Sequence, residues 1–318
     1  MKRSELVVAL LVCISGLAFL TAGYRVVPVQ ASWFYTTVPG TTMADENSGS
    51  MDIPAEKQGQ ENRQDVLPDD SCAGPTALLS VLDRPTMSDS VCSAKKNQVI
   101  AELGYVYQIE TGNNAGTLQT LPQPEIRYGT GGNIELKLFP PNYVLQTTRT
   151  AGTTRRIDGA SDAGIGVKYE FGYGEKWGFA VDSAVTFASG RKDFSANATG
   201  AILNGIFAYN VNEDIGVSLQ IGLFHLFSQV DSAQETSINP ILVVTDQLNE
   251  ITDKVQLYAE CYNSIDLLHG TGIMSSIDAG VQYLLYQNIE IDLEAGHNLT
   301  DLSSNNIMYV GFGTGLEF

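Results

Sequence analysis

The chain has 318 residues, of which 43% are hydrophobic and only 17% are charged, and its formal net charge is −18 at pH 7. So acidic a chain repels the phosphates of nucleic acids, and we expect no nucleic-acid partner. Beyond Gly23 no apolar run is long enough to cross a bilayer as a helix, which argues against a helical membrane protein. Scattered Gly, Tyr, Phe, Val and Ile instead predict an all-β chain.

The N-terminus has the parts of a secretory signal peptide. Lys2 and Arg3 precede an apolar stretch at 6–23, and short or small side chains follow at 29–31. We predict a signal peptide over residues 1–31, cleaved after Ala31. The alternative is an uncleaved membrane anchor, although the apolar run is short for a spanning helix.

Two segments separate this signal from the rest of the chain. Residues 32–70 are polar and acidic without periodicity, which predicts a disordered leader. Residues 71–97 contain Cys72 and Cys92, and in an exported chain we expect these two to form a disulfide rather than to remain thiols.

The remaining cysteine and the histidines do not indicate a metal site or a cofactor. Cys261 lies in an apolar alternating run and is expected to be a small packing residue. His225, His269 and His297 lie far from the cysteine pair and lack zinc-ligand spacing.

From residue 98 to 318 the chain consists of runs of roughly 8–13 residues with period-two alternation, the length that a tilted strand needs to cross an outer membrane. The pattern predicts an antiparallel up-and-down transmembrane barrel of about twelve strands. The predicted strands are 98–109, 121–128, 133–140, 163–173, 176–188, 200–211, 214–226, 238–247, 253–263, 274–286, 288–298 and 306–318.

The links between these runs alternate in length. The even-numbered links are tight, such as "GTGG" and "GE", whereas the odd-numbered ones are longer, above all residues 141–162. Outer-membrane barrels have short periplasmic turns and long external loops. An even number of strands then places both chain ends on the same side, in the periplasm. We expect the barrel to lie in a bacterial outer membrane.

The alternation also predicts which side chains face lipid. In the run from Asn288, Ile289, Ile291 and Leu293 share one face, and acidic residues occupy the other. A soluble barrel would put the apolar set inside. Aromatic residues near the predicted strand ends favour the membrane, because they form girdles at the bilayer surfaces. These aromatics are Phe171, Tyr173, Trp177, Phe207, Tyr209, Tyr105 and Tyr107.

Two lipid-facing positions give a test of this assignment. We expect Val217→Arg or Leu219→Arg to impair assembly, and Gln220→Arg on the inward face to be tolerated.

The chain ends in "YVGFGTGLEF", with apolar residues on one face and Phe318 as the last residue. This resembles the terminal strand that the outer-membrane assembly machinery recognises. We therefore expect that machinery and outer-membrane lipid as partners; the oligomeric state is open.

Several stretches resemble the outer-membrane transporter family named for the meta-pathway of phenol degradation. They are "SCAGPTALLSVLDRPTMSDSVC" from Ser71, "PQPEIRYG" from Pro122, "ELKLFPPNY" from Glu135, "GIGVKYEFGY" from Gly164, "INPIL" from Ile238 and "DAGVQYLLYQNIEIDLEAG" from Asp278. The resemblance covers about Ser71 to Phe318 and implies a barrel for uptake of aromatic or other hydrophobic compounds.

Charged side chains gather on the predicted inward faces, where they would line the pore. Strands two to four carry opposite-signed pairs, and the wall further round is nearly all acidic. These residues are Glu125, Arg127, Glu135, Lys137, Lys168, Glu170, Asp182, Glu260, Asp278, Glu290, Asp292 and Glu294. They form either a polar constriction that selects solutes or a salt-bridge network that fills a narrow barrel. An open acidic lumen would favour cations or neutral solutes over anions.

The preferred function is therefore a passive channel or transporter for small molecules, and not an enzyme. A non-conducting structural or adhesion barrel is the first alternative. A membrane-embedded hydrolase is the second, but its candidates are weak: the three histidines lie near predicted external loops, and "SAKK" at Ser93–Lys96 has Ser-x-x-Lys spacing without a companion motif.

Overall fold

The computed structural model describes residues 72–112, 115–150, 153–173, 176–228, 234–268, 273–299 and 306–318. The predicted signal peptide and acidic leader lie outside these residues. In the described part of the chain, no helix is long and apolar enough to cross a membrane. Its helix α2 (Ala77–Val81) precedes the first strand.

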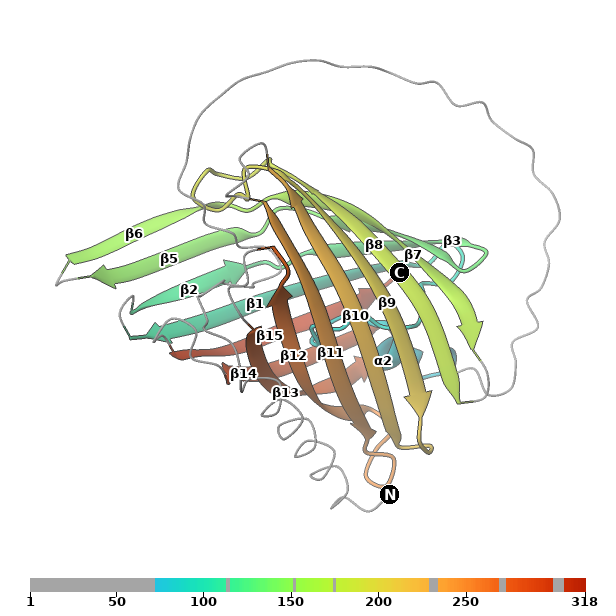
Figure 1. Ribbon diagram of the computed structural model, residues 1–318. Helices are drawn as coiled ribbons and strands as arrows, with labels where there is room; N and C mark the ends of the chain where they lie inside the picture. The colour runs from blue at the N-terminus through green and yellow to red at the C-terminus, as the bar shows by residue number, and fades with distance from the viewer. Residues whose placement is uncertain are drawn as a thin grey trace, which may run out of the picture.

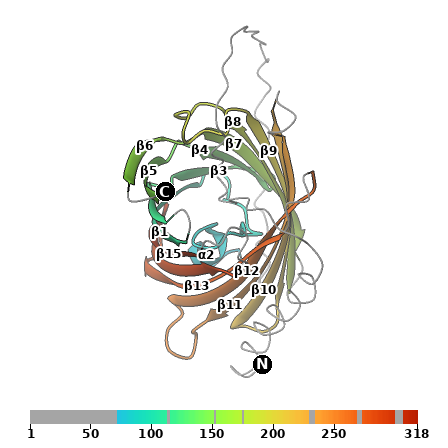
Figure 2. The ribbon, with the colours of Figure 1, turned by 60° about the vertical axis from the view of Figure 1, so that its left-hand side comes forward.

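The strands form one antiparallel sheet, which the order of pairing closes into a barrel (Figures 1 and 2). The strands are β1 (Val99–Thr111), β2 (Gly116–Leu121), β3 (Glu125–Gly131), β4 (Ile134–Phe139), β5 (Tyr143–Thr150), β6 (Thr153–Ala160), β7 (Ala163–Tyr173), β8 (Trp177–Phe187), β9 (Thr199–Asn210), β10 (Ile215–Phe227), β11 (Glu235–Gln247), β12 (Val255–Asp266), β13 (Ile273–Tyr286), β14 (Ile289–Asn298) and β15 (Asn306–Glu317).

Twelve strands make the closed ring, as the sequence predicted. β15 pairs with β1 in an unbroken register from Ile100 opposite Glu317 to Thr111 opposite Asn306. Closure matters because it leaves no unpaired backbone edge in the apolar layer of a membrane. The ring consists of β1, β3, β4 and β7 to β15.

The other strands, β2, β5 and β6, extend one side of the wall beyond the ring. β2 pairs with β1 and β5, and β5 pairs with β6. The prolines within residues 122–124 separate β2 from β3, and those within residues 140–142 separate β4 from β5. Proline cannot donate a backbone hydrogen bond to the ladder, so the strand pairing is interrupted there.

The prediction that residues 141–162 form an external loop is therefore wrong, since β5 and β6 occupy most of this range. The first link is also shorter than predicted, because β2 begins at Gly116. The β5–β6 hairpin was missed for a physical reason. The first four residues of β6 are exposed on both faces, so no apolar alternation marks them as a strand.

The tight links that the structure describes lie where the sequence placed them, at one end of the barrel, here called the turn end; the "GE" link at 174–175 lies outside the described residues. At the turn between β3 and β4, Gly131, Gly132 and Asn133 have φ values of 90°, 65° and 64°. Glycine and asparagine tolerate this left-handed region, which explains the "GTGGN" sequence. The opposite end is here called the loop end.

The chain enters and leaves the barrel at the turn end. The backbone N–H of Val99 donates to the carbonyl of Phe318, and the N–H of Phe318 donates back to Val99. The start of β1 and the end of the chain are thus neighbours, while the Phe318 side chain is 74% exposed.

Side-chain exposure agrees with the predicted facing. On β14, Ile291 and Leu293 are 44% and 60% exposed, whereas Glu290 and Asp292 are 0% and 3% exposed. Apolar side chains outside and charged ones inside are the reverse of a soluble barrel. The aromatic residues Phe171, Trp177, Phe207 and Tyr209 are also exposed on the outer surface near the turn end.

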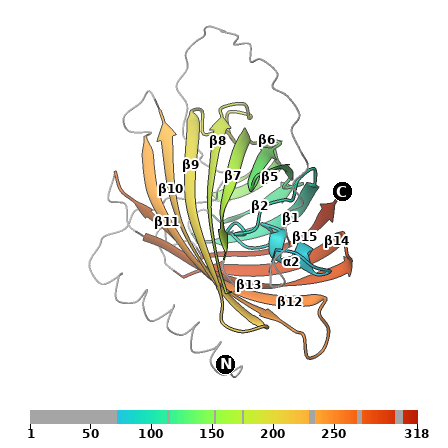
Figure 3. The same cartoon turned by 90° about the vertical axis from the view of Figure 1, so that its right-hand side faces the viewer.

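Residues 72–97, here called the luminal segment, lie inside the barrel (Figures 2 and 3). The apolar face of α2 supplies Leu78, Leu79 and Val81 to a buried cluster, which Ile100 of β1 and Leu284 of β13 complete from the wall. Burial of these aliphatic side chains fixes the helix near the turn end.

Between β6 and β7, Asp162 holds the loop of residues 188–198. Its carboxylate accepts hydrogen bonds from the backbone N–H groups of Ser189, Gly190 and Ala196 at 3.0, 2.8 and 2.9 Å. The loop is thereby fastened beside β6, where the backbone N–H of Arg191 also donates to Ala160.

Asp162→Ala is expected to release this loop, because it removes the carboxylate that accepts all three hydrogen bonds, at a cost of about 1–3 kcal/mol. Trypsin cleavage after Arg191 or Lys192 in folded, membrane-embedded protein should then accelerate. Thr199→Ala, at the exposed start of β9 next to the loop, is the control. Equal cleavage rates for Asp162→Ala and the control would show that Asp162 does not fasten the loop.

Candidate functional site

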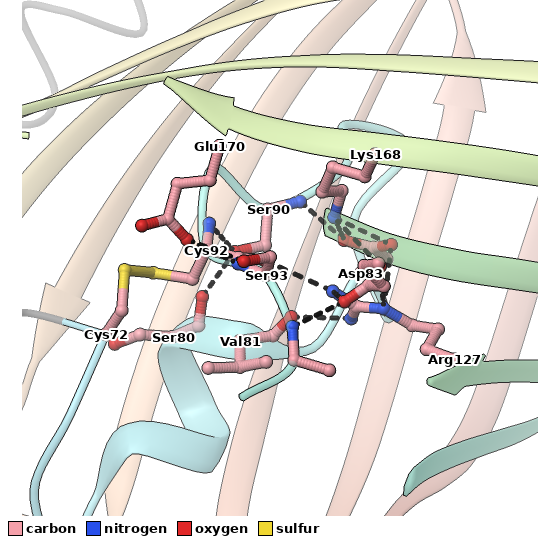
Figure 4. The surroundings of a disulfide bond; sticks show 12 residues. Cys72, Ser80, Val81, Asp83, Ser90, Cys92, Ser93, Arg127, Lys168 and Glu170 are labelled. Carbon is pink, nitrogen blue, oxygen red and sulfur yellow. Dashed lines mark hydrogen bonds and ion pairs between the residues drawn. A yellow bond between two sulfur atoms is a disulfide. The ribbon is translucent and has the colours of Figure 1, made fainter. Parts of the chain in front are cut away.

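The predicted disulfide between Cys72 and Cys92 is present, and it closes the luminal segment into a loop (Figure 4). The two Cα atoms are 5.5 Å apart, and both residues are 2% exposed. Inside the loop, the Ser90 N–H donates to Asp83 at 2.6 Å. The cross-link therefore restrains a short segment that presents Asp83 and Arg84 to the barrel wall. Cys261 is buried on β12, as expected of a packing residue.

Asp83 meets a cluster of three cations, here called the cationic cluster: Arg127 on β3, Lys137 on β4 and Lys168 on β7. The Lys168 and Lys137 ammonium groups lie 2.9 and 2.8 Å from its carboxylate, and Arg127 Nε lies at 3.5 Å. Figure 4 shows Arg127 and Lys168 converging on Asp83 from the wall. All three cations are at most 3% exposed. One carboxylate of the luminal segment thus joins three strands.

Wall carboxylates complete the coordination of these cations. Arg127 pairs with Glu102 at 2.9 Å and with Glu135 at 2.8 Å, and its Nη1 donates to the carbonyl of Val81 at 2.6 Å. A guanidinium offers five donors in a fixed fork, so it can hold two wall carboxylates and the end of α2 together.

Lys137 is surrounded by four carboxylates. Its Nζ lies 2.8 Å from both Asp83 and Asp182, 3.0 Å from Glu125 and 3.1 Å from Asp89. Two of these carboxylates belong to the luminal segment and two to the wall. A buried ammonium is stable only when several such partners replace its lost hydration.

The pKa of Asp83 reflects this environment. Burial by itself would raise it, but the charges of Arg127, Lys137 and Lys168 outweigh burial and hold the pKa far below its usual range. Asp83 is therefore ionised at neutral pH. Because its pKa is lowered in the folded state, the stability that its ion pairs contribute is present above about pH 4 and is lost only as the pH falls further.

Arg84 anchors the luminal segment to another part of the barrel wall. Its guanidinium lies 3.2 Å from Asp292 and 3.6 Å from Glu294 on β14. Burial would lower the pKa of Arg84, but the two carboxylates outweigh it and raise the pKa. Adjacent residues of opposite charge, Asp83 and Arg84, thus contact different parts of the barrel wall.

Further contacts follow the segment around the lumen. The Met87 N–H donates to Glu260 of β12 at 2.7 Å, and the Asp89 N–H donates to Gln220 of β10 at 2.8 Å. At the far end, the Ser93 N–H and hydroxyl both donate to Glu170 at 2.9 Å. The segment therefore touches strands on every side of the barrel.

Glycines of the last strand make room for this arrangement. A β-carbon on Gly313 would lie 2.5 Å from Arg84 Nε, and one on Gly315 would lie 2.4 Å from a methyl group of Leu82. Gly313 and Gly315 of the "GFGTG" sequence are thus explained by side chains of the luminal segment that lie against the β15 backbone, whereas a β-carbon on Gly311 would meet Glu294 of β14.

The acidic wall comprises Glu260, Asp278, Glu290, Asp292 and Glu294, all at most 9% exposed. Tyrosines lie among these carboxylates, and the Tyr309 hydroxyl donates to Asp278 at 2.5 Å. Arg84 is the cation that contacts this wall.

All twelve charges predicted on the inward faces lie inside the barrel, and only Glu125 among them is partly rather than fully buried. The structure joins Arg127, Lys137, Lys168 and their acidic neighbours into one network, and it separates them from the acidic wall. Sequence reasoning missed Asp83, Arg84, Asp89 and Glu102. The charged pair in "LDRP", inside a predicted disulfide loop, was the available signal for the first two.

The candidates for catalysis do not come together. Ser93 is bonded to Glu170, whereas Lys96 is exposed. His225 Nδ1 contacts the Thr236 hydroxyl at 2.8 Å near the loop end, His297 lies at the end of β14, and His269 lies outside the described residues. Among the residues that the structure describes, no group of His, Cys, Asp and Glu side chains could hold a metal ion.

No protein-family model and no curated protein matches the chain. Among solved structures, an outer membrane channel from Pseudomonas putida F1 is similar with a TM-score of 0.55 and 10% identity, covering 74% of this chain and all of that one (100%). The NanC porin gives a TM-score of 0.47 at 11% identity, covering 67% of this chain and 98% of its own. At such low identity the likeness shows the fold, a closed barrel like those of bacterial outer-membrane proteins.

Proposed function

We propose that this protein is a passive outer-membrane channel or transporter for small molecules, with both termini in the periplasm. The observation that carries the proposal is a buried charged interior inside an apolar outer surface. A solute that crosses a membrane through a barrel needs polar groups along the lumen to replace its hydrating water, and the inward charges supply such groups. The turn end then faces the periplasm and the loop end faces outward.

The luminal segment is the gate in this proposal. It crosses the interior from the cationic cluster to the acidic wall and contacts both through ion pairs and hydrogen bonds, while α2 packs into the apolar cluster near the turn end. Water can replace these polar contacts when the segment moves. Closure of the lumen by the segment is therefore reversible.

For the substrate we propose small aromatic or other hydrophobic compounds, on the basis of the resemblance to the phenol meta-pathway transporters. The stretches that carry the resemblance include the luminal segment and the strands that bind it. The resemblance therefore concerns the gate as well as the wall.

Planar-bilayer conductance of the mature protein tests the channel. We expect small discrete steps and a preference for cations over anions, because the acidic wall holds five carboxylates against Arg84. Reversal potentials in salts with different anions and cations would measure that preference. Anion selectivity would contradict the role of the acidic wall, and total silence, even with the disulfide reduced, would contradict the channel.

A non-conducting structural barrel is the second candidate, and one observation favours it. Each member of the cationic cluster is paired with carboxylates on the luminal segment or the wall, as in a permanently filled barrel. Conductance separates the two candidates. In either case we propose that the aromatic end at Phe318 serves assembly, and that the protein is not an enzyme.

A further inference from the structure

The positive charge outside the lumen is unevenly distributed for so acidic a chain. At the loop end, every described lysine and arginine belongs to β5, β6 or the adjoining loop of residues 188–198. They are Arg149, Arg155, Arg156, Arg191 and Lys192. The sequence segments around the rest of that rim, from residue 199 to 247 and from 255 to 318, contain neither lysine nor arginine.

Two of these arginines share the outward face of the β5–β6 hairpin. Tyr143 and Leu145 are 43% and 37% exposed and face outward, so Arg149, further along β5, faces the same way. Arg156 of β6 lies directly opposite Thr147, which is also on this face. Arg149 and Arg156 are therefore diagonal cross-strand neighbours, close enough for both to contact one small anion.

The other cations of this end are arranged differently. Arg155 and Arg191 share Asp193, at 3.6 and 3.4 Å. Asp158, on the outward face two residues from Arg156, accepts a hydrogen bond from the Tyr143 hydroxyl. Arg149 and Arg156 are exposed, and no carboxylate of the described residues forms an ion pair with either.

The position of this pair relative to the apolar surface indicates the partner. Residues directly opposite one another on neighbouring strands connect Arg156 through Thr147 and Thr117 to Ile109 of β1 and Met308 of β15. Ile109 and Met308 are 43% and 54% exposed. Leu145 lies two residues below Thr147 on the same outward face. The arginines thus border the lipid-facing surface, with Arg156 about 7 Å and Arg149 about 14 Å beyond its last leucine on β5.

We propose that Arg149 and Arg156, here called the arginine pair, bind the phosphate groups of lipid in the outer leaflet of the outer membrane. Guanidinium groups bind phosphate through paired hydrogen bonds, and cations at the edge of an apolar band meet headgroups rather than free solutes. The β5–β6 hairpin, which Figure 1 shows reaching past β2, is then a docking surface for phosphorylated lipid such as lipid A.

The test uses the full-length mature protein in phosphatidylcholine vesicles with and without lipid A. Lipid A retained by the purified barrel is measured by native mass spectrometry, and barrel stability by the heat-dependent shift on gels. We expect lipid A to be retained and to raise the unfolding temperature. Arg149→Gln with Arg156→Gln should weaken retention about 30-fold, since each cation near an anionic lipid surface contributes about fivefold.

Lys176→Gln with Lys254→Gln, at the turn end, is the matched control and should retain lipid A like the unaltered protein. If the glutamine pair fails to fold, Arg149→Lys with Arg156→Lys keeps the charge, and we expect weaker retention from the loss of bidentate bonds. Unchanged retention in the arginine variants would overturn the proposal. Displacement of lipid A by an equal concentration of inorganic phosphate would show that the pair binds free phosphate instead.

Discussion

Replacing Asp83 by asparagine is expected to loosen the luminal segment and to increase conductance. The change removes the anion that Lys168, Lys137 and Arg127 share at 2.9, 2.8 and 3.5 Å. Breaking a buried ion pair by removing one partner costs about 3–5 kcal/mol, because the remaining charges stay buried. Planar-bilayer recordings should show larger or more frequent open states than those of the unaltered protein.

A matched control for Asp83→Asn is Asp193→Asn, which removes a carboxylate from two partly exposed arginines at the loop end. It should change neither conductance nor stability by a measurable amount. A double variant, Asp83→Asn with Lys168→Met, should lose less stability than the sum of the single changes, because the two side chains interact directly. Additive losses, with conductance unchanged in Asp83→Asn, would show that this ion pair does not hold the segment.

The second large effect is expected at the lipid-facing surface. Leu219, toward the middle of β10, is 42% exposed on the outer face of the barrel. Leu219→Arg places a charge in the apolar layer, which costs about 2–4 kcal/mol near the bilayer midplane. We expect a strong reduction in folded protein in outer membranes, measured as the fraction that shows the heat-dependent gel shift.

Ile251→Arg is the control for Leu219→Arg, because Ile251 is 73% exposed in a turn outside the strands and its substitution should not affect assembly. Gln220→Arg on the inward face should also assemble. Gln220 is 1% exposed and accepts a hydrogen bond from Asp89, so this substitution acts on the luminal segment rather than on insertion. Normal assembly of Leu219→Arg would contradict the assigned facing.

Much of the barrel is determined by local pattern. A strand that crosses a membrane must alternate between lipid and lumen, so β14 can be identified from its own residues, with Ile291 outward and Asp292 inward. Twelve ring strands, the tight turns and the Cys72–Cys92 disulfide follow from similarly local signals. The inward charges follow as well, because facing needs no knowledge of the partner strand.

The β5–β6 hairpin and the position of the luminal segment were decided only by the tertiary structure. Residues 153–156 are exposed on both faces, so a strand that extends beyond the apolar layer has no alternation to reveal it. The luminal segment is held by contacts such as Arg84 with Asp292, 208 residues apart in the chain. No periodicity relates two such positions. They meet because closure of the barrel brings β3, β4, β7 and β14 around one buried loop, whose Asp83 contacts cations on the first three strands and whose Arg84 contacts carboxylates on β14.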